Sequence, residues 1–175
     1  PDAINLSAGS PWPYCLDIYY DEIDMVEALG IVVVCAAGNT GYGPYTVLSP
    51  ANRAVDSVTN FAVGSVEHSS GNVWWSSSRG PSLCDSVSIK PNVCAPGAYI
   101  RCAVPGTGYE YHGGTSMATP HVTGAVAILR QYAPDATARQ IKEALLAGAT
   151  PRGDVHPNND YGWGIINIPK SMEYL

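Results

Sequence analysis

The stretch Gly113–Val122, with the sequence GGTSMATPHV, holds a serine in a setting suited to nucleophilic chemistry. Two glycines precede the serine and let the backbone come close to a substrate. The apolar run 122–129 that follows predicts a helix that begins beside Ser116. The first N–H groups of a helix have no partner within it and lie at its positive end, so they could hold an oxyanion formed near this serine. Pro120 is expected at the edge of the first turn, where a missing N–H costs least.

The same spacing also fits a helix without a catalytic role. Serine is a common N-cap residue, and Gly124, Ala125 and Ala127 would let such a helix pack closely. Position alone leaves both interpretations open. His121 is not a candidate base, because five residues along a helix turn its side chain about 500° from that of Ser116.

The elements before this helix predict a parallel sheet. Residues 4–7 form a short apolar segment, and residues 31–37 form a β-branched run typical of a fully buried strand. Between them, residues 16–29 have helical spacing and an acidic outer face, and Gly30 ends the pattern. Its expected inward positions are Tyr19, Ile23, Val26, Ala28 and Leu29. Strand, helix and buried strand in this order form a right-handed crossover.

Asn39 follows the buried strand, in the sequence Gly38-Asn39-Thr40-Gly41. Parallel sheets place ligand chemistry at the carboxyl ends of their strands. Taken by itself, Asn39 is interpreted as an ordinary turn residue, for which Asn-x-Gly is typical. Its side-chain amide can donate hydrogen bonds without titrating.

Further elements are read along the second half of the chain. Residues 99–104 are expected to form a strand, and residues 105–112 a loop leading to the serine. Ala133 and Pro134 should end the serine helix. Thr137–Gln140 is a capping box that starts another helix, with Ile141, Leu145 and Leu146 inward and Gly148 at its end.

Composition excludes several classes of protein. The chain has 175 residues, of which 46% are hydrophobic and 14% charged, so we expect one packed domain over residues 1–175. Its net charge of −6 argues against nucleic acid or an anionic membrane as a partner. No apolar run is long enough to cross a membrane, and Pro1-Asp2-Ala3 does not open a signal peptide.

The cysteine pattern argues against a zinc site or a redox motif. The five cysteines leave at least one thiol unpaired, and no Cys-x-x-Cys pair occurs. Cys35 lies in the buried strand and should behave as a small apolar residue. The residues themselves assign no cellular compartment.

The segment Gly113–Val122 resembles the nucleophile motif of the subtilisin-like serine proteases, or subtilases, usually GTSMAxPHV; the residue before it is Gly113 where serine is usual. Other segments resemble the family in the same order; they are residues 33–39, 49–66, 74–81, 90–97 and 161–167. The second of these implies a strand at residues 58–66. Within them, Asn92 replaces the usual Asp. The resemblance covers nearly the whole chain, and it makes Ser49–Pro50 a candidate for a cis peptide bond.

The resemblance implies roles for several residues. Ser116 would be the nucleophile, Asn39 the oxyanion donor and His121 structural. Seven residues are expected to contact the substrate. The backbone of Ser7, Ala8 and Gly9 would pair with an extended peptide, and Ala36, Ala37 and Gly38 would form one wall of the pocket for the residue before the scissile bond. The seventh is Thr115. Small wall residues would leave room for a large apolar side chain. The implied fold is α/β, with a doubly wound, mostly parallel sheet and helices on both faces.

Two parts of the family pattern do not occur. The triad of the family runs Asp, His, Ser along the chain, yet no Asp-x-Gly precedes Ser116 here, since the one such tripeptide is Asp160-Tyr161-Gly162, and the one His-Gly is His112-Gly113. The sequence therefore reads as the carboxyl-terminal part of a subtilase catalytic domain, incomplete at its amino-terminal side. The alternative is a non-enzymatic peptide-binding or scaffold module that kept the cleft without a base.

Partners and cofactors follow from this interpretation. We expect a peptide or protein substrate, and a separate amino-terminal part carrying the Asp and His. The unpaired edge of the strand at residues 4–7 could also pair with a second copy. No cofactor or metal ligand set is evident, although the resemblance allows structural calcium at a site that the sequence does not assign. It also favours a secreted or cell-surface location.

Overall fold

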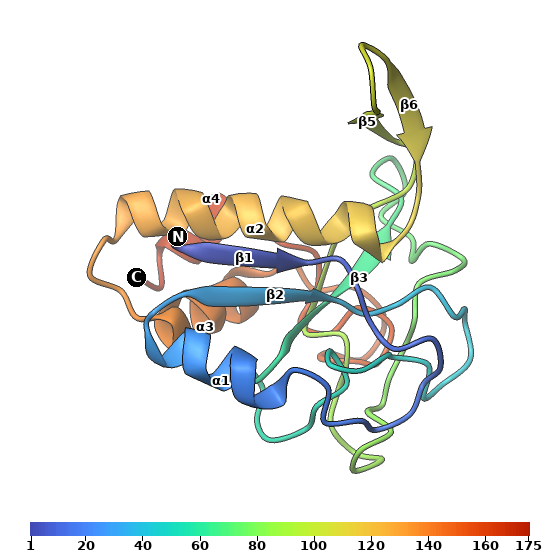
Figure 1. The fold of residues 1–175 in the computed structure, drawn as a ribbon, viewed down its shortest axis with the longest axis horizontal. Coiled ribbons are helices and arrows are strands. Elements are labelled where there is room, and N and C mark those ends of the chain that lie inside the picture. Colours follow the sequence, from blue (N-terminus) through green and yellow to red (C-terminus); the bar gives the residue numbers. More distant parts are fainter.

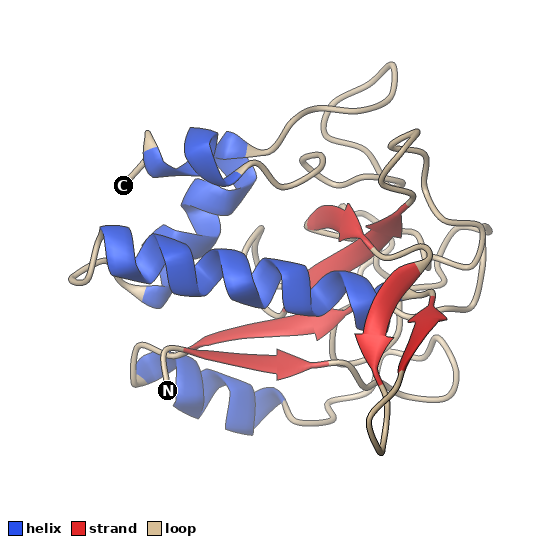
Figure 2. Cartoon of the chain, turned by 90° about the horizontal axis from the view of Figure 1, so that it is seen from above, coloured by secondary structure: helices blue, strands red, loops and turns tan.

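A four-stranded parallel sheet forms the centre of the computed structural model, which describes residues 1–175 (Figure 1). Its strands are β1 (Ala3–Leu6), β2 (Val32–Ala36), β3 (Phe61–Val66) and β4 (Val93–Pro96), in that spatial order. β1 pairs only with β2, so its other edge is free. Figure 2 shows the strands running in the same direction.

Helices cover both faces of this sheet. Alternate residues of β2 point to opposite faces: Val32 and Val34 join a core cluster with helices α2 (Thr115–Tyr132) and α3 (Ala138–Gly148). Val33 and Cys35 join a second cluster with Ile23 of helix α1 (Tyr20–Ala28). The expected doubly wound α/β fold is confirmed. A last short helix, α4 (Ile168–Met172), packs against α3.

Several local predictions hold. The capping box of α3 is present, with Thr137 and Gln140 each bonded to the other's backbone N–H. α2 ends at Tyr132, and the Ser49–Pro50 bond is cis. Cys35 is fully buried, and burial raises the pKa of its thiol to about 12, so it stays neutral.

The position of Pro120 differs from the prediction. It lies inside α2, six residues into the helix, rather than at the edge of the first turn. Its missing N–H therefore leaves the carbonyl of Ser116 without the usual helical donor.

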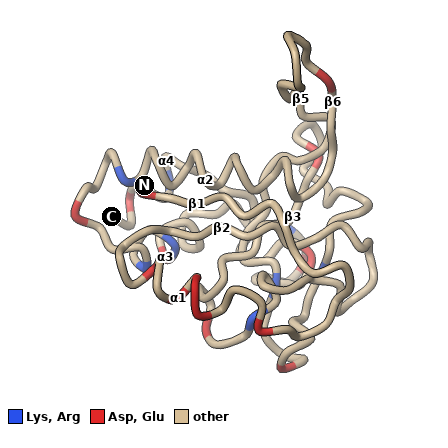
Figure 3. Tube along the Cα trace, in the orientation of Figure 1, with Lys and Arg blue, Asp and Glu red and all other residues tan.

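Helix α1 is shorter and less buried than predicted. It begins at Tyr20, after Tyr19 in a left-handed conformation, and Ile23 is its one buried residue. Tyr19 is 54% exposed and Leu29 is 75% exposed. The helical spacing of apolar residues in the sequence predicted that both side chains face inward. That spacing does not indicate where the chain bends away from the sheet. Acidic residues occur along α1, as Figure 3 shows, and the two in its first turn, Asp21 and Glu22, are exposed.

Residues 105–112 are not all loop. β5 (Ile100–Ala103) and β6 (Tyr109–His112) form an antiparallel hairpin that projects from the body of the molecule (Figure 1). All four residues of β6 are exposed, so the segment lacks the alternation that marks a half-buried strand. None of the helices is long and apolar enough to cross a membrane.

Candidate active site

Ser116 is the second residue of α2, at the carboxyl-terminal edge of the sheet. Among the first N–H groups of the helix, that of Thr115 donates to Asn39 Oδ1 at 2.9 Å and that of Met117 donates to the Gly114 carbonyl at 3.0 Å. The N–H of Ser116 has no partner within the chain. The residue therefore combines a half-buried hydroxyl with a free backbone donor.

Gly114, the N-cap of α2, permits the close contact with Asn39. It is buried and has φ 141°, a region that residues with a Cβ rarely adopt. A Cβ built at this position would lie 3.0 Å from Asn39 Oδ1. The second glycine of the pair is thus needed to bring the end of β2 against the start of α2.

The side chain of Asn39 is fixed by Thr115. Asn39 Oδ1 accepts hydrogen bonds from the Thr115 N–H and from Thr115 Oγ1, the latter at 3.2 Å. Gly38 N–H in turn donates to Thr115 Oγ1 at 3.2 Å. Because the carbonyl oxygen is already engaged, the free group of the amide is the Nδ2 donor.

A cavity of about 280 Å³ lies in front of Ser116 and Asn39. It is lined by Ser7, Ala8, Gly9, Ser10, Pro11, Ala36, Gly38, Asn39, Thr40, Leu48, Thr115 and Ser116. None of these residues is charged, so the cavity suits an uncharged or apolar group.

The cavity is lined by all but one of the catalytic and substrate-contacting residues expected from the sequence. Ala37 does not line it, because its side chain packs in the core on the α1 side of the sheet. Sequence reasoning missed Ser10, Pro11, Thr40 and Leu48. Leu48 reaches the cavity from the loop that precedes the cis proline, and Gly38 accommodates it: a Cβ on Gly38 would lie 2.6 Å from Leu48 Cγ.

A second hollow, of about 250 Å³, lies on the other side of Ser116. Ile100, Cys102, Met117, Pro120 and His121 line it together with Ser116. The nucleophile candidate thus lies between two hollows, an arrangement that suits a chain passing across it on both sides.

No histidine is bonded to the hydroxyl of Ser116. His121 Nδ1 donates to the Met117 carbonyl at 2.8 Å, as expected for a structural residue. His112, on the hairpin, lies 3.7 Å from Glu110. The site therefore holds a nucleophile candidate and two N–H donors but no general base bonded to it.

No group of three or more His, Cys, Asp or Glu side chains is placed to hold a metal ion.

Comparison with known proteins gives a consistent result. A sequence profile of the subtilase family matches residues 1–164. Subtilisin DY of Bacillus licheniformis is 36% identical over 174 residues, which cover 98% of this chain and 57% of that protein. Bacillopeptidase F of Bacillus subtilis (strain 168) is 36% identical over 177 residues, covering 95% of this chain and 12% of that protein.

A solved structure, that of the prenylagaramide maturation protease PagA, superposes with a TM-score of 0.80 at 28% identity. The match covers 99% of this chain and 62% of that one. The chain thus spans between about an eighth and about three fifths of the length of these relatives.

Proposed function

The chain belongs to the subtilase family, and from that premise we propose that it is the part of a serine endopeptidase that carries the nucleophile, the oxyanion donors and much of the substrate cleft. The observation that carries this proposal is the pair of hydrogen bonds from the Thr115 N–H and Oγ1 to Asn39 Oδ1, here called the brace. The brace directs the Asn39 amide donor toward the cavity that Ser116 lines. An asparagine that only forms a turn does not require these hydrogen bonds.

In the proposed reaction, Ser116 Oγ attacks the carbonyl carbon of a peptide bond held across the two hollows. The carbonyl oxygen becomes negative as the new C–O bond forms. Asn39 Nδ2 and the Ser116 N–H donate to that oxygen, and donors already in place stabilise the transition state more than the substrate. Collapse of the intermediate releases the amine and leaves an acyl-enzyme on Ser116, which water then hydrolyses.

The proton of Ser116 needs a base that this chain does not supply at hydrogen-bonding distance. We propose that a segment outside this sequence supplies the His and the Asp, as the order of the family's triad implies. The free edge of β1 is the place where a further parallel strand of that segment could pair. By itself, the chain is then expected to be inactive.

The substrate is proposed to be a peptide or protein. The uncharged lining of the larger cavity favours an uncharged, large side chain before the scissile bond. The extended backbone of the peptide would lie beside Ser7, Ala8 and Gly9, which continue from β1.

An oxidising compartment fits the cysteines. Cys15 and Cys84 form a disulfide, whereas Cys35, Cys94 and Cys102 are free. Disulfides persist mainly in secreted and surface proteins. We therefore propose a secreted or cell-surface protein.

A second candidate is a peptide-binding or scaffold module without catalysis. The absence of a histidine bonded to Ser116 favours it. Labelling by a serine-directed phosphonate separates the two. With the upstream segment added, the wild-type chain should be labelled at Ser116 and Ser116→Ala should not. If neither is labelled, although sedimentation shows that the two parts have assembled, the chain is the non-catalytic module.

A further inference from the structure

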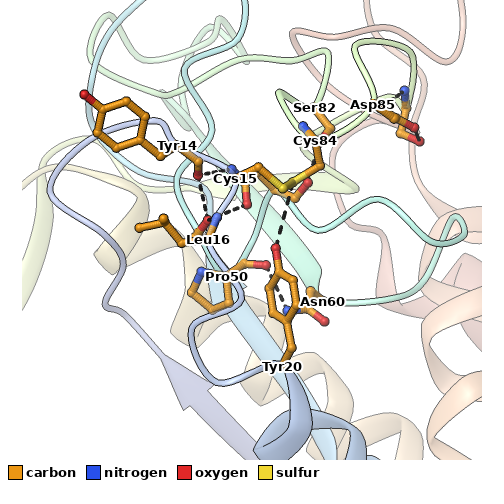
Figure 4. The surroundings of a disulfide bond; sticks show 12 residues. Tyr14, Cys15, Leu16, Tyr20, Pro50, Asn60, Ser82, Cys84 and Asp85 are labelled. Atoms are coloured by element: carbon orange, nitrogen blue, oxygen red, sulfur yellow. Dashed lines mark hydrogen bonds between the residues drawn. A yellow bond between two sulfur atoms is a disulfide. The ribbon is translucent and has the colours of Figure 1, made fainter.

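The disulfide Cys15–Cys84 joins the segment after β1 to a surface loop 69 residues further along the chain (Figure 4). Cys15 is exposed and Cys84 is partly exposed, so a small reagent can reach the bond. Tyr20 lies beside it, with its hydroxyl 3.9 Å from Cys84 Sγ.

Ser49, fully buried, holds the same segment from the inside. Its hydroxyl oxygen accepts from the Leu16 N–H at 2.9 Å and lies 2.7 Å from the Tyr14 carbonyl. Asn52 Nδ2 also donates to that carbonyl, at 2.8 Å. Both neighbours of Cys15 in the sequence are therefore tied to Ser49. Figure 4 shows these neighbours, Tyr14 and Leu16, beside the disulfide.

The backbone of Ser49 connects this anchor to the larger cavity. Ser10 N–H donates to the Ser49 carbonyl at 2.8 Å, and Ser49 N–H donates to Ser10 Oγ at 3.1 Å. Ser10 and Pro11 form part of the cavity wall, and so does Leu48, the neighbour of Ser49. The wall and the disulfide are thus two ends of one short segment, residues 10–16.

Little else holds that segment. It contains no helix or strand, and its two large aromatic side chains, Trp12 and Tyr14, are 64% and 60% exposed. Its one internal backbone bond runs from the Tyr14 N–H to the Trp12 carbonyl. Segments with few buried contacts open at low free-energy cost, so the order of residues 10–16 depends on the few ties that they have.

We propose that Ser49 and the Cys15–Cys84 disulfide position the wall of the larger cavity, and that the disulfide makes this positioning sensitive to reduction. A small dithiol gives two electrons and two protons to the S–S bond. The bond breaks, Cys15 and Cys84 each become a thiol, and the dithiol becomes its own disulfide. The only hydrogen bonds that then join residues 10–16 to the rest of the chain are those with Ser49 and Asn52, and the wall loosens.

We call the joint action of Ser49 and the disulfide on residues 10–16 the clamp. Hydrogen–deuterium exchange of the whole protein, oxidised and after dithiol treatment, tests the clamp without using activity. We expect the amides of Ser10, Tyr14 and Leu16 to exchange about tenfold faster after reduction. Amides of β3 should keep their rates and so report that the fold persists. A Cys15→Ser/Cys84→Ser variant should exchange fast at residues 10–16 with no reductant. In Cys102→Ser, which keeps the disulfide, the amides of residues 10–16 should exchange at the wild-type rates before and after reduction.

Equal rates in the oxidised and reduced proteins, with β3 protected in both, would overturn the proposal. If reduction also removes the protection of β3, the disulfide stabilises the whole fold and not residues 10–16 in particular, and this result would overturn the proposal as well. The consequence for peptides rests on the proposed function: reduction should raise KM several-fold and change kcat little. A protein that shows the exchange response but never cleaves a peptide would contradict the proposed function and leave the clamp standing.

Discussion

Ser7 Oγ donates a hydrogen bond to the carbonyl oxygen of Ser116 at 3.1 Å, across the junction of β1 and α2. In a regular helix that carbonyl would accept from the N–H four residues on, but that residue is Pro120 and has none. Asn5 Nδ2 donates to Ser7 Oγ at 2.9 Å, and Thr123 Oγ1 donates to Asn5 Oδ1 at 3.2 Å. The end of β1 is thereby fixed to Ser116, the proposed nucleophile.

Ser7→Ala removes the hydroxyl and leaves the backbone that would pair with substrate. In the assembled enzyme we expect kcat to fall about fivefold, the value of one hydrogen bond near 1 kcal/mol, with KM little changed. Ser7→Thr keeps a hydroxyl and should recover most of kcat. Steady-state kinetics on a peptide substrate measure both constants. An unchanged kcat in Ser7→Ala would show that the bond does not position Ser116.

Asn39→Ala should remove one of the two proposed oxyanion donors. In a subtilisin, loss of one such donor lowers kcat by about 10²–10³, and we expect a loss of that size here. KM should change little, because the donor acts on charge that develops only in the transition state. The neighbouring Thr40→Ala, also in the cavity wall, is the matched control. If Asn39→Ala is as active as this control, Asn39 is a turn residue.

The meeting of Ser116 with Asn39 could be predicted from the sequence. Both follow elements that end at the same edge of a parallel sheet, and both lie in recognisable motifs. The brace between Asn39 and Thr115 could not, since it joins residues 76 positions apart through side-chain geometry. Ala37 shows the limit of motif reading: the pleat turns it into the core while Ala36 and Gly38 face the cavity.

The error at Pro120 has a physical reason of the same kind. A proline inside a helix is disfavoured when it leaves a carbonyl without a donor. Here Ser7, 109 residues away in the sequence, supplies that donor. Local rules cannot include a partner that only the fold brings near. The same holds for Leu48 and Ser10, which reach the cavity because the loop at Ser49 folds back on β1.

Breaking the buried ion pair between Lys142 of α3 and Glu27 of α1 should lower the free energy of unfolding more than breaking any exposed ion pair of the chain. Lys142 Nζ lies 2.7 Å from Glu27 Oε2, with side chains 3% and 17% exposed. Glu27→Gln leaves the ammonium group buried without its counter-charge, and we expect the free energy of unfolding to fall by about 3 kcal/mol. Glu143→Gln breaks the exposed pair with Arg139, worth less than about 1 kcal/mol. Urea denaturation compares the two, and equal losses would contradict the prediction.

Lys90 should make stability depend on pH in the alkaline range. It is 1% exposed, and burial lowers the pKa of its ammonium group to about 7, although Nζ donates to the Thr59 and Asn60 carbonyls. Between this pKa and the ordinary pKa of 10.5, the unfolded chain binds the proton and the folded chain does not. The contribution of Lys90 to the free energy of unfolding therefore rises with pH across that window, by up to about 1.4 kcal/mol per unit.

The measurement is urea denaturation from pH 7 to pH 9. Lys90→Met should flatten the rise of the unfolding free energy with pH, even if it lowers stability throughout. Lys170→Met, at a partly exposed lysine, should keep the wild-type slope. Parallel curves for the wild type and Lys90→Met would mean that Lys90 keeps its proton in the folded protein.

The free edge of β1 leads to the last prediction. Val32 N–H donates to the Asp2 carbonyl at 3.0 Å, so the backbone N–H and C=O of Asp2 face β2. Since the direction of these backbone groups alternates along a strand, the N–H and C=O of Ala3 and Asn5 face the free edge. We expect this edge to take a strand from the upstream segment and, without it, to pair with a second copy or aggregate. Sedimentation of the chain with and without a separately made upstream segment reports which of these occurs.

Ala3→Pro identifies the edge as the site of assembly. Proline removes the N–H that faces outward and leaves the bonds to β2 in place. We expect it to weaken assembly with the upstream segment about fivefold or more, because at least one intermolecular hydrogen bond is lost. Ala3→Val keeps the N–H and should assemble like the wild type. Since the same segment would bring the Asp and His, labelling of Ser116 by the phosphonate should fall in parallel with assembly in Ala3→Pro. A monomer that melts cooperatively and ignores the upstream segment in all three forms would rule out assembly through β1 and favour the non-catalytic module.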